Sequence, residues 1–526
     1  MGPVTVLLHV APGGGLVVAG WLMPRRLARS RFGGPAALLL DAAPLALGAL
    51  LLGIASGRPL FVGVVVLALG AAFTVADYAM RETLREPVVF SESVELPQVF
   101  THPHLYLPFA GPGLVLGGGA AALALAVMLL AIEPPLWPPQ PLAAAGAAAL
   151  FAAVLWLLAC PFPLAAAARV LHRLEPRGEP DVDAAALGPF AMLIVHTVLA
   201  RAERPARQRS LAAPALVRAR GEPEGGPTGG PIVIVQCESF FDARRLSPRI
   251  PRELLPGFEA CCTSAAQFGR LEVPGWGANT MRTEFAVLSG VPESELGYDR
   301  FNPYYALARV PLASQVWRLR RAGYRTICLH PFDRRFFRRD LVMPALGFDE
   351  FLGRETLGGA RRPPYCPDPE LGRHILRLLD AAGPRTFIFA ITMGNHGPWM
   401  AKGPPLDPAI ERLFDRGELP DDGGLLRYLD GLRRSDEMLR LLAAGLERRD
   451  DNAVLGFYGD HLPSLSGAFA HFGFDEPHSD YAIWPGTSGA PRRIDVPAHR
   501  LGSLVIDAAL GTMPVPEGRR RLEAAG

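Results

Sequence analysis

The sequence has little net charge and almost no lysine. Of its 526 residues, 53 are basic and 51 are acidic, which gives a formal net charge of +2, and Lys402 is the single lysine. A chain this close to neutral lacks the excess of basic side chains that marks most nucleic-acid-binding proteins. Because 49% of the residues are hydrophobic, wholesale disorder is excluded as well. We therefore expect a folded protein without a nucleic-acid partner.

Cysteine is also scarce. The chain has six cysteines, one of which, Cys160, lies in a long apolar run. The adjacent pair Cys261 and Cys262 stands alone, so no regular framework for disulfides is visible. The sequence therefore gives no indication of a disulfide-stabilised fold.

Charge is nearly absent from the first third of the chain. Residues 1–168 hold seven arginines and seven acids, and the other 90 charged side chains follow them. About 20 apolar residues suffice to cross a bilayer as a helix. The segment has five long apolar runs: residues 4–23, 36–55, 60–76, 113–132 and 142–168. We predict a membrane domain over residues 1–168 with about five spans.

Three further features concern this membrane domain. Asp41 is the one acid well inside an apolar run, and the sequence shows no partner for it. Residues 86–109 are rich in Pro, His and aromatics and are predicted to be a loop at the surface. Residues 185–200, interrupted by Pro189 and His196, are short for a span and are predicted to form an interfacial helix.

The basic residues leave the orientation open. Arginines cluster at residues 25–31, 81–85 and 169–177, and the positive-inside rule places such clusters in the cytoplasm. With five spans, that preference leaves the C-terminal part in the cytoplasm, whereas a sixth span at residues 185–200 would export it.

A second domain follows a connecting region at residues 169–230. That region holds the predicted interfacial helix and ends in a Gly/Pro-rich linker at residues 221–230. Beyond it, β-branched runs alternate with helical patterns, which predicts a mostly parallel sheet covered by helices on both faces. The predicted strands are residues 232–236, 325–329, 386–392 and 453–458, and the predicted helices are residues 280–288, 312–322, 370–381 and 425–448. We assign residues 231–515 to this α/β domain and residues 516–526 to a tail.

Polar residues follow each of the four predicted strands. They are Glu238, His330, the pair Asn395 and His396, and the pair Asp460 and His461. Functional residues of parallel sheets gather beyond the carboxyl ends of the strands. Each residue also has a structural interpretation, since Glu238 could cap a helix and His396 could belong to a turn. The coincidence at four strand ends favours a site.

Two carboxylates and an imidazole suit a divalent cation. Glu238, Asp460 and His461 offer the oxygen and nitrogen ligands that Mn²⁺, Mg²⁺ and Zn²⁺ accept. We expect Gly459 to permit a tight turn that brings Asp460 and His461 to one ion. Thr280 follows a glycine-rich turn at a predicted helix start, where a fourth ligand and a nucleophile could lie. Alternatively, Thr280 or Asn279 is only a helix N-cap, with Thr280 and Glu284 framing the first turn.

Five motifs occur in this order and at similar spacing in a known family. The sequence resembles the lipoteichoic acid synthase-like phosphoglycerol transferases, membrane-anchored members of the alkaline phosphatase and sulfatase superfamily. The motifs are Gln236-Cys-Glu238-Ser, Gly277-Ala-Asn-Thr280 with Glu284-Phe285, His330-Pro-Phe-Asp-Arg-Arg-Phe-Phe337-Arg-Arg339-Asp340 ahead of Leu346-Gly-Phe-Asp-Glu-Phe351, Thr392-Met-Gly-Asn-His396-Gly-Pro, and Tyr458-Gly-Asp460-His461. The resemblance covers nearly the whole chain, because that family also has about five N-terminal spans, a linker and an exported α/β domain.

The resemblance implies a site and a reaction. It implies that Thr280 is the nucleophile and that His396 faces the phosphoryl group or the leaving oxygen. The implied ligands of one Mn²⁺-like cation are Glu238, Thr280, Asp460 and His461, and the implied lining of the glycerol-phosphate pocket is His330, Phe337 and Arg339. Phosphoglycerol would pass from a phospholipid such as phosphatidylglycerol to a glycan or polyol-phosphate acceptor. The protein would be a multi-pass protein of the bacterial inner membrane, with its catalytic domain on the periplasmic or extracellular side.

The sequence departs from the family at Arg282, where a small or acidic residue is frequent, and at Phe337, where Trp is common. Three alternatives stay open. A sulfatase would need a nucleophilic Cys or Ser followed by Pro and Arg, and the residues after Cys261-Cys262 lack both. A phosphoethanolamine transferase would share the metal and the threonine but usually carries several disulfides. A catalytically silent domain that binds glycan or lipid would not need the four metal positions, so metal analysis separates it from an enzyme.

Overall fold

The computed structural model describes residues 3–106, 109, 111–213, 229–357, 365–399, 405–412, 424–449, 452–485 and 490–511. Most of the predicted linker and the predicted tail 516–526 lie outside these ranges. The chain divides into two compact units, Met1–Ala206 with Gly297–Phe301, and Arg207–Leu296 with Asn302–Gly526.

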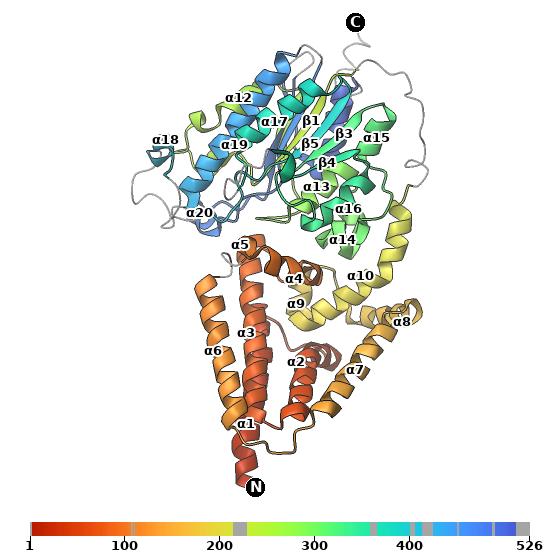
Figure 1. The fold of residues 1–526 in the computed structure, drawn as a ribbon, viewed down its shortest axis with the longest axis vertical. Helices are drawn as coiled ribbons and strands as arrows, with labels where there is room; N and C mark the ends of the chain where they lie inside the picture. The colour runs from red at the N-terminus through yellow and green to blue at the C-terminus, as the bar shows by residue number, and fades with distance from the viewer. Residues whose placement is uncertain are drawn as a thin grey trace. The chain divides into compact units, whose positions relative to one another are not determined.

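The first unit is built of long apolar helices (Figure 1). Prolines stand at the start of most of them, where the missing N–H is not needed and the fixed φ suits a helix. The helices are α1 (Pro3–Leu27), α2 (Pro35–Ser56), α3 (Pro59–Leu84), α6 (Pro112–Ile132) and α7 (Pro141–Leu158). Three segments are long and apolar enough to cross a membrane, namely α2, α3 and Gly113–Ile132 of α6. These helices indicate membrane anchoring.

The predicted span at residues 142–168 is not one straight helix. The chain breaks between α7 and α8 (Pro161–Leu171), and the two segments are bent by 89°. Pro161 explains the break, because its ring excludes the preceding residue from helical geometry and it has no N–H to donate. If this bent pair is one span, four segments of the described residues qualify. The count of five spans stays a prediction.

Two segments predicted as irregular or interrupted are helical. Residues 86–109, expected to be a loop, contain α4 (Glu92–Thr101) and α5 (Pro103–Tyr106). Pro189 does not interrupt a helix but begins one, since α9 (Pro180–Leu187) ends before Gly188 and α10 (Pro189–Leu211) follows. Gly188 has a φ of 104°, a conformation that favours glycine.

Asp41 has partners that the sequence did not reveal. Its Oδ2 accepts hydrogen bonds from Arg25 Nη1 at 2.6 Å and from Trp21 Nε1 at 2.7 Å. Its Oδ1 accepts from the backbone N–H groups of Phe190 and Ala191 at the start of α10. The sequence showed no partner for Asp41, because the cation and the helix end that satisfy it come from other elements of the unit.

The second unit contains a nine-stranded mixed sheet with the order β4-β3-β5-β1-β6-β7-β2-β8, and β9 pairs with β2. Strands β4, β3, β5, β1 and β6 run parallel, whereas β7 is antiparallel to both β6 and β2. The strands are β1 (Ile232–Cys237), β2 (Gln267–Glu272), β3 (Arg325–Leu329), β4 (Glu350–Leu352), β5 (Thr386–Ile391), β6 (Val454–Gly459), β7 (Ser479–Trp484), β8 (Arg492–Arg493) and β9 (Val496–Pro497). The predicted α/β class with a mostly parallel sheet is confirmed.

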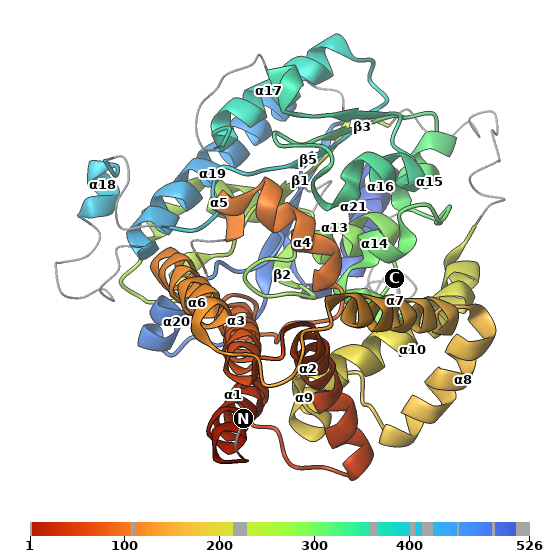
Figure 2. The same cartoon turned by 60° about the horizontal axis from the view of Figure 1, so that its bottom comes forward.

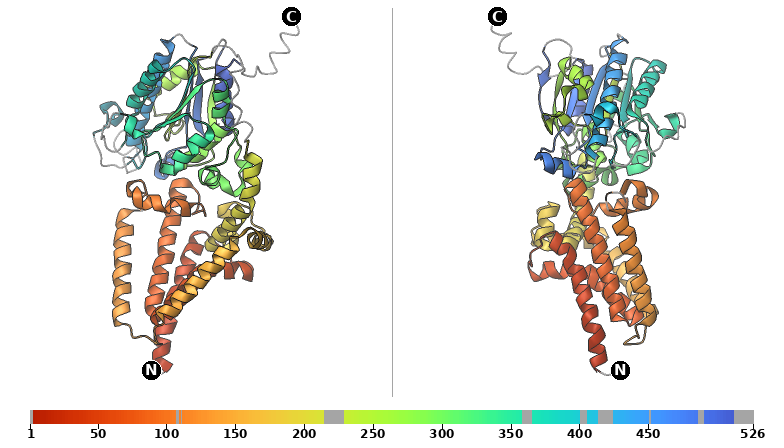
Figure 3. Two further views of the ribbon diagram at one scale, coloured as in Figure 1. Left: turned by 45° about the vertical axis from the view of Figure 1, so that its right-hand side comes forward. Right: turned by 90° about the vertical axis from the view of Figure 1, so that its left-hand side faces the viewer.

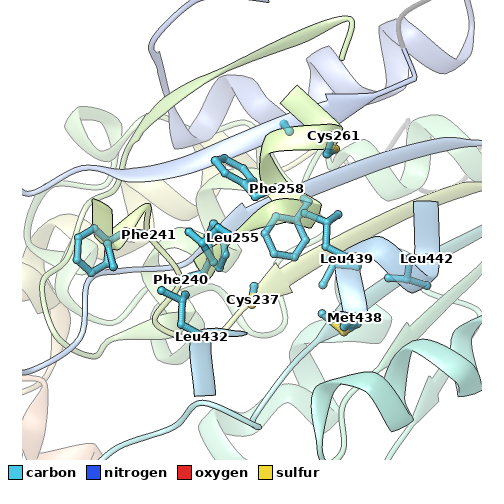
Figure 4. Packing of buried hydrophobic residues seen from close by; sticks show 14 of the residues in the cluster. Cys237, Phe240, Phe241, Leu255, Phe258, Cys261, Leu432, Met438, Leu439 and Leu442 are labelled. Atoms are coloured by element: carbon cyan, nitrogen blue, oxygen red, sulfur yellow. The ribbon is translucent and has the colours of Figure 1, made fainter. Parts of the chain in front are cut away.

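Helices cover both faces of the sheet (Figures 1, 2 and 3). Alternate side chains of the strands enter two separate cores, so Val233 and Val235 face one core while Ile232 and Ile234 face the other. The first core is closed by α12 (Pro256–Thr263), α17 (Asp368–Ala381), α19 (Gly424–Glu447) and α20 (Ser466–Phe472), and Figure 4 shows its packing around Phe258 and Leu439. The second is closed by α13 (Thr280–Ser289), α14 (Pro303–Leu307), α15 (Gln315–Arg321), α16 (Arg339–Leu346) and α21 (Ala498–Ala509), and the short α18 (Pro408–Glu411) contacts α19.

Candidate active site

The parallel strands bring the predicted residues to one edge of the sheet. Glu238 directly follows β1, and Asp460 and His461 directly follow β6, the neighbour of β1. Cys237 pairs with Gly459, so the next residues of the two strands, Glu238 and Asp460, lie side by side. Gly459 is part of the strand rather than of a turn. A Cβ there would lie 1.7 Å from the carbonyl oxygen of Phe240, so this position requires glycine for space.

Glu238, Asp460 and His461 form a buried cluster whose potential ligand atoms all lie within 4.8 Å of one another. Nε2 of His461 is 3.6 Å from Glu238 Oε1 and 3.3 Å from Asp460 Oδ2. Nδ1 of His461 is 2.9 Å from the carbonyl oxygen of Leu462, which can only accept, so Nδ1 carries a proton and Nε2 is the ring nitrogen left to bind a metal ion. Asp460 Oδ2 is buried and accepts no hydrogen bond among the described residues. Lone pairs that face one another in this way fit a bound cation.

The electrostatics of the cluster agree with that fit. Burial and the neighbouring charge of Asp460 raise the pKa of Glu238 to about 8. Two carboxylates this close disfavour each other's ionised form, and a divalent cation between them would reverse the effect. The residues present therefore suit a metal ion.

Ser239 and Thr392 support the cluster and were not singled out from the sequence. Ser239 has a φ of 55°, and its N–H donates to Asp460 Oδ1 at 2.8 Å while its hydroxyl donates to Glu238 Oε1 at 2.9 Å. The hydroxyl oxygen of Thr392 accepts the N–H of Glu238. A left-handed residue other than glycine is uncommon and is often found at functional sites. Both residues stand in the quoted motifs, but their contacts depend on neighbouring strands.

Thr280 is the first residue of α13, and its Oγ1 lies 3.4 Å from Nε2 of His461. Asn279 occupies the N-cap position with a φ of 66° and makes no side-chain capping hydrogen bond. Glu284 is engaged with Arg339 rather than with the helix start. The capping-box alternative therefore has no support in the structure, and the threonine hydroxyl faces the metal cluster.

His330, Phe337 and Arg339 lie together beyond β3. Arg339 is buried, its Nη1 is 3.3 Å from His330 Nε2, and its guanidinium carbon is 5.2 Å from the centre of the Phe337 ring. Burial and the adjacent Arg339 charge lower the pKa of His330 well below its usual range, so its ring is neutral. Phe337 and Arg338 have φ values of 55° and 57°, a strained pair of conformations beside the site.

His396 follows β5, and its Nδ1 is 2.6 Å from the carbonyl oxygen of Gly397. Burial lowers its pKa, which leaves Nε2 of a neutral ring free to face a substrate. Its ring centre is 5.4 Å from that of Tyr365, a residue that no sequence pattern indicated. Burial and the nearby charge of Glu238 raise the pKa of Tyr365. Asn395 is buried and accepts a hydrogen bond from Trp399.

The chain is similar to several known proteins. The sulfatase family model matches residues 232–488. The chain is 30% identical over 479 residues to the capsular polysaccharide biosynthesis protein RkpI of Rhizobium meliloti (strain 1021), covering 86% of this chain and 84% of RkpI. It is also 30% identical over 264 residues to a protein of the same organism provisionally described as a cyclic beta-1,2-glucan modification protein, covering 50% of this chain and 39% of that protein.

Among solved structures, the chain is similar to the Streptococcus pyogenes phosphoglycerol transferase GacH in complex with sn-glycerol-1-phosphate. The TM-score is 0.41 at 21% identity, over 59% of this chain and 81% of that chain. The match to RkpI spans both the apolar helices and the sheet domain. The protein therefore belongs to the same family as RkpI, with a sulfatase domain that follows N-terminal apolar helices.

Proposed function

We propose that the protein transfers phosphoglycerol from a membrane phospholipid, phosphatidylglycerol, to an acceptor in the cell envelope. One observation carries the proposal: the hydroxyl of Thr280 lies at the start of a helix, 3.4 Å from His461 in a cluster that fits a cation. A helix N-terminus favours an anionic nucleophile or a phosphoryl group. The resemblance of the five motifs to phosphoglycerol transferases supports the choice of head group.

Glu238, Thr280, Asp460 and His461 would hold one divalent cation, with Mn²⁺ favoured and Mg²⁺ or Zn²⁺ compatible with the same ligands. A bound cation lowers the pKa of a coordinated hydroxyl and offsets charge on phosphoryl oxygens.

The proposed reaction has two displacements. Oγ1 of Thr280 attacks the phosphorus of the diester, the bond to the diacylglycerol oxygen breaks, and diacylglycerol leaves with the proton. The hydroxyl of the acceptor then attacks the glycerophosphoryl-threonine and the threonine regains its proton. His396 would contact the phosphoryl group or the leaving oxygen, and His330, Phe337 and Arg339 would line the glycerol-phosphate pocket.

The name of one relative supports a choice of acceptor. RkpI is named for capsular polysaccharide biosynthesis, which supports a surface glycan as the acceptor. Such an acceptor is consistent with a catalytic domain on the periplasmic or extracellular side of the inner membrane. A phosphoethanolamine transferase is the alternative, although all six cysteines are free.

The surroundings of Cys261 do not support this residue as the nucleophile of a sulfatase. Cys261 packs in the apolar core with Phe258 and Leu255 (Figure 4). Burial raises its pKa to about 12, so the thiol is protonated at neutral pH and is a poor nucleophile.

Mass spectrometry of the full chain tests the proposal. After incubation with Mn²⁺ and phosphatidylglycerol, the peptide containing Thr280 should gain the mass of a glycerophosphoryl group, and the Thr280→Ala variant should gain none. Incubation with phosphatidylethanolamine serves as the control for the head group. A phosphoethanolamine adduct would replace phosphoglycerol as the transferred group, and full transfer activity in Thr280→Ala would overturn the proposed nucleophile.

A further inference from the structure

A buried carboxylate lies one helical turn from the proposed nucleophile. Glu284 is four residues after Thr280 in α13, so the two side chains share a face of the helix. Glu284 is fully buried, with an exposed fraction of 0%. A carboxylate so placed needs partners, since an unpaired buried charge is very costly.

The partners of Glu284 fill its hydrogen-bonding capacity. Arg339 donates through Nε to Oε1 and through Nη2 to Oε2, both at 2.9 Å, in a bidentate ion pair. The hydroxyl of Tyr304 donates to Oε1, and Nε2 of Gln236 donates to Oε2 at 3.0 Å. Glu284 therefore binds neither substrate nor metal, but it neutralises the arginine that lines the pocket.

The charge of Arg339 has no other acidic partner in the described ranges. Its remaining side faces His330, whose Nε2 accepts from it. Burial and the charge of Arg339 lower the pKa of His330, so the ring is uncharged. The two carboxylates of Glu238 and Asp460 balance a divalent cation. Because Glu284 cancels the charge of Arg339, the site has no net positive charge left to balance a second negative charge on the phosphoryl group.

We propose that Glu284 sets the charge selectivity of this site, by cancelling Arg339 so that monoanionic phosphodiesters are accepted and dianionic phosphate monoesters are disfavoured. The inference rests on the proposed function, since it concerns the same phosphoryl pocket. Glu284 acts through Arg339 and is a positioning residue. Without its charge, Arg339 would attract the dianion more strongly at short range, where Coulomb energies are large.

The test compares two chromogenic probes on the full chain in detergent with Mn²⁺. Bis(4-nitrophenyl) phosphate is the diester, and 4-nitrophenyl phosphate is the monoester. Glu284→Gln should raise the ratio of monoester to diester kcat/KM by about tenfold or more, because the positive charge of Arg339 is then no longer cancelled. Tyr304→Phe is the matched control, because it removes a hydrogen bond to Glu284 and leaves the charge unchanged, so the ratio should stay within about threefold.

An unchanged ratio in a folded Glu284→Gln variant that still binds Mn²⁺ would overturn the inference. If that variant does not fold, Arg339→Gln and the double variant Glu284→Gln/Arg339→Gln replace it. The double variant should exceed Arg339→Gln in diester cleavage, and equal or lower activity would refute the charge argument. If the wild type cleaves no diester, the proposed function fails, and affinities of inorganic phosphate and dimethyl phosphate for wild type and Glu284→Gln still decide the charge question.

Discussion

Asp460 is the residue on which the candidate metal site depends most. Its Oδ1 accepts two backbone N–H groups, from Ser239 and His461, which fix the carboxylate in place. Its Oδ2 accepts no hydrogen bond from the part of the chain that the structure describes, and it belongs to the same cluster as Glu238 and His461. A buried acceptor without a donor costs stability. A cation bound to Oδ2 would offset this cost.

Asp460→Asn should weaken Mn²⁺ binding by more than about 100-fold, since loss of supporting residues alone costs 10- to 100-fold. Isothermal titration of the metal-free protein with Mn²⁺ measures this change. The metal-free variant should be at least as stable as the wild type, because the repulsion between Asp460 and Glu238 is gone. Asp380→Asn, which alters an acid with 72% side-chain exposure, is the control and should bind as the wild type does. Equal affinity in Asp460→Asn would exclude it as a ligand.

Removal of the metal should destabilise the wild type. Dialysis against a chelator is expected to lower the thermal midpoint of the wild type, because a bound cation stabilises the folded state and offsets the buried carboxylates. Addition of Mn²⁺ should restore it. Asp460→Asn should show neither change, and a wild-type midpoint indifferent to chelation would contradict the site.

At the scale of elements, α1 and α3 pack through glycines. A Cβ on Gly70 would lie 2.1 Å from the carbonyl oxygen of Gly20, and one on Gly63 would lie 2.6 Å from that of Gly13. Such small residues let two membrane helices approach closely.

Gly70→Ala should therefore destabilise this helix pair by about 1–3 kcal/mol, the usual cost of overpacking, although alanine is the better helix former. The matched control is Gly118→Ala in α6, where a Cβ would meet nothing within 4 Å. Thermal unfolding of both variants in detergent gives the comparison. If Gly70→Ala is as stable as Gly118→Ala, the close approach of α1 and α3 is wrong.

Asp368 joins three elements of the second unit. It begins α17, accepts the N–H of Gly394 after β5 at 3.0 Å, and accepts the hydroxyl of Ser435 in α19 at 2.6 Å. Burial outweighs these hydrogen bonds and raises its pKa to about 6 from 3.8. The folded state thus keeps a proton that the unfolded chain releases, so stability falls as the pH rises from about 4 to about 6.

In Asp368→Asn this loss should be absent, and the variant should gain up to about 3 kcal/mol relative to the wild type between pH 4 and pH 7. Urea unfolding at the two pH values measures the difference. Asp380→Asn should show no such gain. A wild-type to variant difference that does not change with pH would mean that Asp368 is ionised at both values.

The elements were more predictable than their contacts. The four predicted strands all lie in the sheet, because short β-branched runs between turns have few other solutions, and the strand-end rule placed Glu238, Asp460 and His461 at one edge. The sequence could not show that Glu284 pairs with Arg339, or that Tyr365 stands beside His396, because these contacts join elements far apart in the chain. From the sequence, Glu284 was visible as a motif residue and as part of a possible helix cap.

At the scale of the whole molecule, the first unit has little charge, but two of its acids stabilise the starts of helices. Asp41 binds the start of α10, and Glu133 accepts the N–H groups of Leu60 and Phe61 at the start of α3. Each carboxylate thus meets the positive end of a helix, where it is stabilised and satisfies N–H groups that have no partner within their own helix. Composition alone predicts an apolar anchor. These pairings join residues far apart in the chain, so only the folded structure reveals them.

The scarcity of lysine offers a test of the orientation that the arginine clusters leave open. Lys402 is the one lysine of the chain and belongs to the predicted α/β domain. If the domain is exported, a membrane-impermeant amine reagent added to intact spheroplasts should modify the Lys402 peptide as fully as it does after permeabilisation. A cytoplasmic domain would be modified only after permeabilisation, and the arginine clusters would then be the better guide to orientation. An exported domain would have access to lipid head groups of the outer leaflet and to surface glycans, the two substrates that the proposed transfer must join.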